Sequence, residues 1–225
     1  MTARRAAAAL VAGVIGASLG PARPAQAEPS DAELTWLGVG LALPTYALGV
    51  SLHEGSHALA ATLVGAEVLS LSVLPGRDPQ TGAFHFGLTR VRGLGSRGNK
   101  LFFYLAPKLT NTVLLAGFTG LVVSDAWPDN RYGQLTLSVL ATGLWVDFSK
   151  DVLSFSPHND VVKAMSLCGL RSEWARLPVR LGYATLAVTW AFFVARGYQR
   201  TFADPSAPSA PAAQARVWPM WSTRF

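Results

Sequence analysis

The sequence predicts an all-α integral membrane bundle, with about four transmembrane helices after a signal peptide and a small β-hairpin after the first helix. Half of the 225 residues are hydrophobic and 14% are charged, whereas soluble proteins average about 25% charged residues. A soluble domain needs more charge to cover its surface. The length allows one domain, and long apolar segments divide most of it.

The N-terminus is typical of a secretory signal. Arg4 and Arg5 precede an apolar run over residues 6–19, and Ala25-Gln26-Ala27 supplies the small-x-small pattern of a cleavage site. We expect residues 1–27 to be a signal peptide. Without cleavage, residues 6–20 would remain as an extra anchor.

The remaining chain divides into a membrane domain and a tail. Residues 203–225 are rich in Pro, Ala and Ser, a composition that cannot bury enough apolar surface to fold. We expect a disordered tail there, and a membrane domain over residues 28–202.

Four apolar segments are expected to form the bundle, over residues 34–52, 101–124, 132–146 and 181–195. The first continues as an apolar-rich helix to about residue 65, with a kink at Pro44. The second is interrupted only by Lys108. The third is short for a membrane span and could extend through Asp147.

Charge between these segments predicts their orientation. Loops 66–100 and 150–180 hold most of the Lys and Arg between the spans, whereas loop 125–131 holds two Asp and one Arg. The positive-inside rule places the first two loops in the cytoplasm. We expect a multi-pass protein of the bacterial plasma membrane, with the lipid bilayer as partner. The formal net charge of +6 then reflects topology, not a nucleic-acid partner.

Residues 67–91 differ from the apolar segments around them. Residues 68–73 and 84–89 favour β-structure, and residues 75–79 between them have the composition of a turn. The pattern predicts a β-hairpin close to the membrane surface. An exposed edge of such a hairpin could hold an extended peptide by strand addition.

The motif that carries chemistry is His53-Glu54-Gly55-Ser56-His57. Four residues along a helix return a side chain to nearly the same face, so both imidazoles can bind one zinc ion. Glu54 can act as the general base on a zinc-activated water. The alternative is two core histidines beside an interfacial carboxylate. Three ionisable groups in an apolar helix would then each need a separate partner.

Residues 52–61, followed by the helix exit at residues 64–68, resemble the first motif helix of the site-2 protease family of intramembrane metalloproteases. Residues 104–111 are similar to its Gly-Pro-x-x-Asn element, although Ala106 replaces the glycine and Asn111 lies one residue further on. The resemblance covers about residues 40–165. A PDZ insertion is lacking, as expected for a minimal member.

The third similarity is residues 155–160, which resemble the family's Asn/Pro-rich loop ending in a zinc-binding Asp, here Asp160-Val161 in place of Asp-Gly. The resemblance implies a zinc metalloendopeptidase that hydrolyses peptide bonds of membrane-associated protein or peptide substrates. It implies His53, His57 and Asp160 as zinc ligands, Glu54 as the catalytic residue and Asn111 as a substrate-binding residue.

The third ligand has alternatives, because a catalytic zinc site needs three protein ligands. His158 could replace Asp160, which could instead cap the helix that starts there. His85 is expected on the surface of the hairpin. Asp147 and Asp151 are further candidates, but with Lys150 they are expected to form a solvated cluster at the membrane interface.

Two other function classes stay open at this point. A non-catalytic membrane protein could bind zinc or clients without cleaving them, which the incomplete second and third motifs favour. A structural membrane protein would bind no metal at all. The single cysteine, Cys168, excludes an intrachain disulfide and makes a cysteine-based zinc site implausible.

Overall fold

The computed structural model describes residues 28–78, 80–124, 126–153 and 159–203. This part of the chain is mostly helical with a small β-region, as predicted. The predicted signal peptide, and the predicted tail beyond residue 203, lie outside the described residues. In chain order the elements are α2 (Asp31–Leu63), β1 (Glu67–Ser72), β2 (Gly76–Arg77), β3 (Phe84–His85), β4 (Leu88–Arg92), α3 (Arg97–Val123), α4 (Arg131–Leu153), α5 (Asp160–Leu167) and α6 (Glu173–Thr201).

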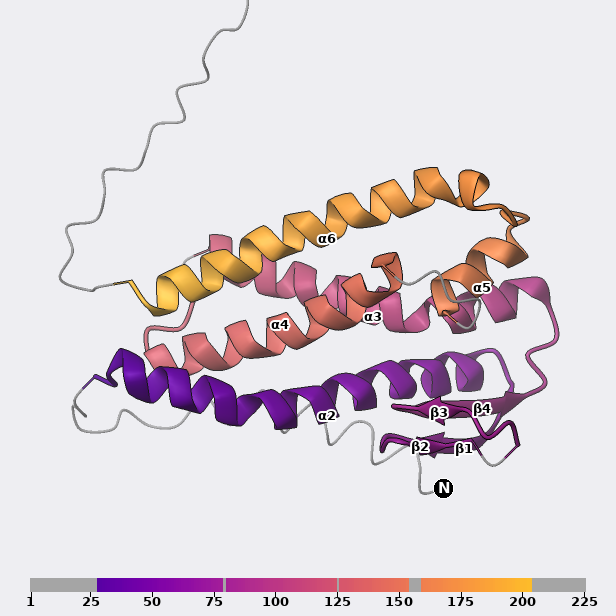
Figure 1. The fold of residues 1–225 in the computed structure, drawn as a ribbon, viewed down its shortest axis with the longest axis horizontal. Coiled ribbons are helices and arrows are strands. Elements are labelled where there is room, and N and C mark those ends of the chain that lie inside the picture. Colours follow the sequence, from indigo (N-terminus) through magenta and orange to yellow (C-terminus); the bar gives the residue numbers. More distant parts are fainter. Residues whose placement is uncertain (1–27, 79, 125, 154–158, 204–225) are drawn as a thin grey trace, which may run out of the picture.

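Each predicted apolar segment lies in one of the long helices α2, α3, α4 and α6, which run side by side (Figure 1). Local sequence explains where α2 begins. The Ser30 hydroxyl accepts a hydrogen bond from the Glu33 N–H, and the Glu33 carboxylate accepts one from the Ser30 N–H. This reciprocal cap satisfies two backbone donors at the helix start. Ser96 and Ser172 cap α3 and α6 in the same position.

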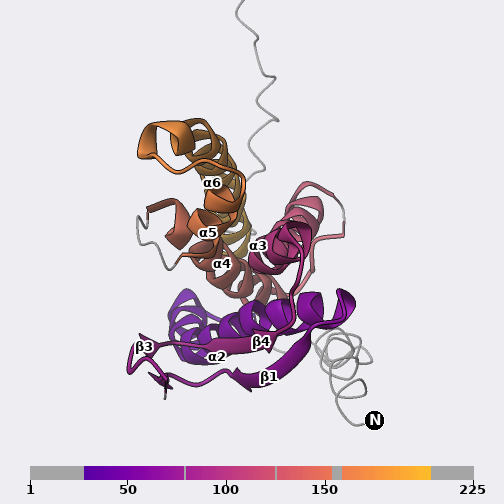
Figure 2. The same cartoon turned by 90° about the vertical axis from the view of Figure 1, so that its right-hand side faces the viewer.

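Helix α4 lies at the centre of the bundle and contacts α2, α3 and α6 (Figure 2). The main core forms where α3, α4 and α6 meet. Its buried residues are Leu115, Phe118, Val122, Trp127, Ala141, Phe148, Ala187, Trp190 and Val194. Helix α5 is short and contacts α3. The bundle therefore builds its core from three helices, with α2 added against α3 and α4.

Helices α2, α3 and α6 are long and apolar enough to cross a membrane. Large apolar side chains on them face outward, including Trp36, Val113 and Phe192, which is expected of surfaces in contact with lipid. Three of the four predicted spans are therefore found as candidates. Helix α4 is not among them, and Asp147, with further charged residues near it, interrupts its apolar segment.

The hairpin forms, but its second strand is divided. Strand β1 pairs antiparallel with β4, while the short β2 and β3 pair beyond them. The predicted strand over residues 84–89 breaks at Phe86 and Gly87. The Phe86 ring lies edge-on to Tyr46 with centroids 6.3 Å apart. Gly87 packs so closely that a Cβ there would lie 2.7 Å from Val50. The hairpin thus runs back along the half of α2 that carries the motif (Figure 1).

Candidate metal centre

The motif residues are held on the inner side of α2. Glu54 and His57 are buried, at 8% and 5% exposure. Asp160 is the first residue of α5. The cap of this helix is the preceding residue, Asn159, whose side chain accepts hydrogen bonds from the Val161 and Val162 N–H groups. Because Asn159 caps the helix, the Asp160 carboxylate is available to face the histidines.

The structure brings the three predicted ligands together. The Nε2 atom of His57 lies 3.0 Å from Asp160 Oδ2, and the Nε2 atom of His53 lies 3.6 Å from the same oxygen. All three ligand atoms lie within 4.8 Å of one another. In a tetrahedral site with metal–ligand bonds near 2.0 Å, ligand atoms lie about 3.3 Å apart. His85 belongs to β3, outside this group, and His158 lies outside the described residues.

The other ring nitrogens are held by two different acceptors. His57 Nδ1 lies 2.8 Å from the Phe103 carbonyl oxygen, and His53 Nδ1 lies 3.0 Å from Asp147 Oδ2. A carbonyl oxygen can only accept, so the His57 Nδ1–H must donate. A neutral ring that carries its proton on Nδ1 has a lone pair on Nε2.

This arrangement brings hydrogen-bond acceptors of His53, His57 and Asp160 close together. If both rings are neutral, the Nε2 lone pairs of His53 and His57 both point toward the carboxylate of Asp160, with no proton between them. Either a ring is protonated or a cation lies among the three atoms. Carboxylates and carbonyls that hold the outer nitrogen of a histidine are the usual partners of metal-binding histidines.

The charge of Asp160 fits this arrangement. Burial raises the pKa of the Asp160 carboxyl, but His53 and His57, where their rings donate to it, and the nearby Lys163 lower it by more, so its pKa lies well below the ordinary value. Lys163 Nζ lies 3.1 Å from the second carboxylate oxygen, Oδ1. Asp160 is therefore ionised at neutral pH, the state that a metal ligand needs.

Asp147 belongs to a buried network that supports His53. Besides the histidine, its Oδ2 accepts a hydrogen bond of 2.6 Å from the Asn111 amide. Lys108 Nζ lies 2.6 Å from the Asp147 carbonyl oxygen and 2.6 Å from the carboxylate of Asp151. The Lys108 residue is only 3% exposed. One buried lysine on α3 thus neutralises acidic side chains one turn apart on α4.

This network corrects the predicted solvated cluster. Asp147 and Asp151 are largely or fully buried, and only Lys150 is half exposed. Lys108, the lone charge in the second apolar segment, could have indicated buried acidic partners, because a charge inside a membrane span requires a partner. Asn111, the predicted substrate-binding residue, lies one hydrogen bond from Asp147 and is buried.

The hairpin closes over Glu54. The Thr89 hydroxyl lies 2.7 Å from Glu54 Oε2 and 3.0 Å from the Glu54 carbonyl oxygen. A Cβ at position 87 would lie 2.6 Å from Glu54 Cγ. Neither Thr89 nor Gly87 was predicted from the sequence to belong to the site. A glycine inside an alternating strand pattern is a signal of close backbone approach.

No protein-family model, curated protein or solved structure matches this chain. Its chemistry is therefore inferred from the site itself.

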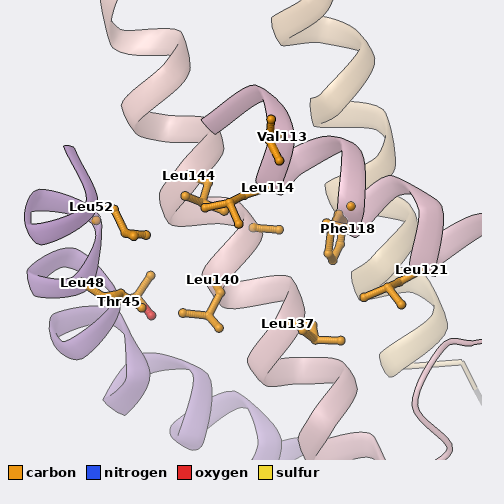
Figure 3. Close-up of a pocket in the computed structure, with 13 residues that line it drawn as sticks. Thr45, Leu48, Leu52, Val113, Leu114, Phe118, Leu121, Leu137, Leu140 and Leu144 are labelled. Atoms are coloured by element: carbon orange, nitrogen blue, oxygen red, sulfur yellow. The ribbon is translucent and has the colours of Figure 1, made fainter. Parts of the chain in front are cut away.

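An apolar cavity of about 420 Å³ lies between α2, α3 and α4 (Figure 3). On each of these helices, one lining residue is close in sequence to the candidate metal centre or to the network that supports it. Leu52 directly precedes His53, Leu114 lies one turn after Asn111, and Leu144 lies one turn before Asp147. The cavity lining thus comes within about one helical turn, along each helix, of a residue of the charged site or of its supporting network.

Proposed function

We propose that this protein is a membrane zinc metalloprotease of the site-2 protease type, which hydrolyses peptide bonds of membrane-associated substrates. One observation carries the proposal. The Nε2 atoms of His53 and His57 lie 3.6 and 3.0 Å from the same carboxylate oxygen of Asp160, while both Nδ1 atoms are held by acceptors. Glu54 lies in the same helical turn, where a metalloprotease has its general base.

The donor set suits a catalytic zinc ion. Two imidazole nitrogens and one carboxylate oxygen are ligands that zinc accepts, and three protein ligands leave a fourth position open. A zinc ion in this position would polarise a carbonyl group and lower the pKa of a water molecule. The cysteine-free site is also suited to chemistry, since structural zinc sites are usually closed by four protein ligands that include cysteine.

The protein's own residues have separate tasks in this proposal. Glu54 takes the proton from the attacking water and delivers it to the leaving amine. Thr89 holds the Glu54 carboxylate through its hydroxyl. Asp147 and the Phe103 carbonyl keep the protons of His53 and His57 on Nδ1, so the Nε2 lone pairs stay available for metal binding.

The substrate must be extended at the cleaved bond, because a transmembrane helix keeps its peptide groups in internal hydrogen bonds. Strand β4 pairs with β1 on one edge, and the described residues add no strand to its other edge. A peptide added there would run beside Thr89 and Glu54. The neighbouring apolar cavity offers space for apolar side chains. Asn111 would contact substrate through its amide oxygen, since its amide nitrogen donates to Asp147.

The first test is the zinc content of the detergent-purified protein beside His53→Ala, Asp160→Ala and His158→Ala. We expect nearly one zinc per chain in the wild type and in His158→Ala, and loss of zinc from the other two. Loss from His158→Ala but not from Asp160→Ala would replace the third ligand. A wild type that takes up no zinc after reloading would refute the proposal.

The second test separates catalysis from binding. Glu54→Gln keeps the size of the side chain but removes the base, so we expect full zinc content and loss of cleavage of a co-expressed membrane substrate, by more than about 100-fold. The measurement is product formation on immunoblots. Unchanged cleavage by Glu54→Gln would exclude Glu54 as the base.

A non-catalytic zinc-binding or client-binding protein is the second candidate. The observation that favours it is the closure over Glu54, whose carboxylate is bonded by Thr89 and packed against Gly87. This alternative predicts zinc in the wild type, no cleavage of any substrate, and client binding that Glu54→Gln leaves unchanged.

A further inference from the structure

The acceptor that holds His57 is a backbone atom, and the sequence explains why it is available. In an α-helix the N–H of each residue bonds the carbonyl four residues earlier. The residue four positions after Phe103 is Pro107, which has no N–H. Helix α3 is continuous through both positions. The Phe103 carbonyl therefore lacks its usual helical donor.

His57 supplies the missing donor. Its Nδ1 lies 2.8 Å from the Phe103 carbonyl oxygen, in a contact buried on both sides. A buried carbonyl without a partner would be costly, and a buried histidine with a free Nδ1–H equally so. Each group thus satisfies the other. The bond also fixes the tautomer of His57 and directs its Nε2 toward Asp160, 3.0 Å away.

We propose that Pro107 is a positioning residue for the metal centre. By withholding a backbone N–H, it reserves the Phe103 carbonyl for His57 and so keeps the His57 Nε2 lone pair directed at the metal position. This inference rests on the proposed zinc site and gives the fully buried Pro107 a role apart from bending α3. The residue acts through one backbone carbonyl and touches neither zinc nor substrate.

The expected effect follows from the chemistry of the carbonyl. An oxygen with two lone pairs can accept two hydrogen bonds, so an added N–H at position 107 competes with His57 and does not exclude it. Losing an outer partner of a metal-binding histidine typically weakens metal binding by 10–100-fold. For Pro107→Ala we expect the lower end, an increase in the zinc dissociation constant of about tenfold.

The test must separate the effect of adding an N–H at position 107 from the effect of removing the proline ring. Pro107→Ala removes the ring and adds an N–H. Lactic acid at position 107, introduced by nonsense suppression, removes the ring and replaces the N–H by an ester oxygen. Pro178→Ala is the matched control, because Pro178 lies inside α6, which supplies none of the three ligands. Each purified full-length protein is titrated with zinc against a competing chelator, and its cobalt form is compared by visible absorption.

The proposal expects about tenfold weaker zinc binding and an altered cobalt spectrum for Pro107→Ala. It expects values near those of the wild type for the lactic acid variant and for Pro178→Ala. Equal affinity of Pro107→Ala and wild type would overturn it. Equally weak binding by the alanine and lactic acid variants would also overturn it, because the ring would then be the cause. A wild type without zinc would refute the proposed function itself, an outcome distinct from these two.

Discussion

Lys108 connects the metal centre to the interior of the bundle. Its ammonium group lies against Asp151 and Asp147, and Asp147 holds His53. Removing one partner of a buried ion pair leaves an uncompensated charge, whereas exposed pairs contribute little. The lysine is therefore expected to support both the stability of the protein and the position of one ligand.

Lys108→Met should lower the free energy of unfolding by about 3–5 kcal/mol, because it leaves two carboxylates without their buried cation. Lys150→Met is the matched control, since Lys150 contacts the same Asp147 but its side chain is 52% exposed. We expect that control to change stability by no more than about 1 kcal/mol. Denaturant unfolding in detergent measures both, and equal losses would contradict the assigned role of Lys108.

At this scale the sequence predicted the residues that share a local pattern. His53, Glu54 and His57 follow from helical spacing. Asp160 was predicted from a family resemblance, and the structure places it beside His53 and His57. Asp147 could not be assigned, because its partners come from α2 and α3, far away in sequence. The Phe103 carbonyl could not be assigned either, since no side-chain pattern reports a backbone acceptor.

The hairpin is the element that covers the proposed general base. It approaches α2 closely at Gly87, where a side chain would meet Glu54 and Val50 at less than 3 Å. The approach also breaks the predicted second strand, because the chain at Phe86 and Gly87 follows α2 and not a partner strand. Tertiary packing against the motif thus overrides the local β-alternation.

Gly87→Ala is expected to reduce cleavage by at least about tenfold and to leave zinc content unchanged. The added methyl group must displace the Glu54 carboxylate, and small misplacements of a catalytic group are costly. Gly76→Ala is the control within the same hairpin, where a Cβ meets only ordinary contacts, 3.5 Å from His85. Loss of zinc from Gly87→Ala would indicate general damage, and full activity would exclude a tight fit at Glu54.

For the whole molecule, the predicted topology places the loop between α4 and α6 in the cytoplasm and the loop before α4 outside. Three of the four predicted spans correspond to helices that are long and apolar enough to cross a membrane, because that property depends on composition alone, whereas α4 does not meet it. The order in which they pack could not be predicted. Helices α3 and α4 each contact all the other long helices, a relation that the hydropathy of a single segment does not contain.

The topology can be tested with the exposed Cys168. We expect a membrane-impermeant maleimide to label it in inverted membrane vesicles but not in spheroplasts. Asp129→Cys in a Cys168→Ser background should give the opposite result, since Asp129 lies in the exposed loop before α4. Labelling of both positions from one side would contradict an odd number of crossings between them.

The contact between His57 and the Phe103 carbonyl also bears on mutational scanning of this protein. Every amino acid placed at position 103 keeps the same carbonyl oxygen. A scan there therefore samples the ring, whose centroid lies 4.5 Å from that of the imidazole, and never the oxygen atom that accepts the hydrogen bond from His57. Substitutions affect the hydrogen bonding of that oxygen at position 107 instead, four residues away, where every coded replacement for proline introduces an N–H. A tolerance map would therefore assign the support of His57 to Pro107, although the hydrogen-bond acceptor is the Phe103 carbonyl.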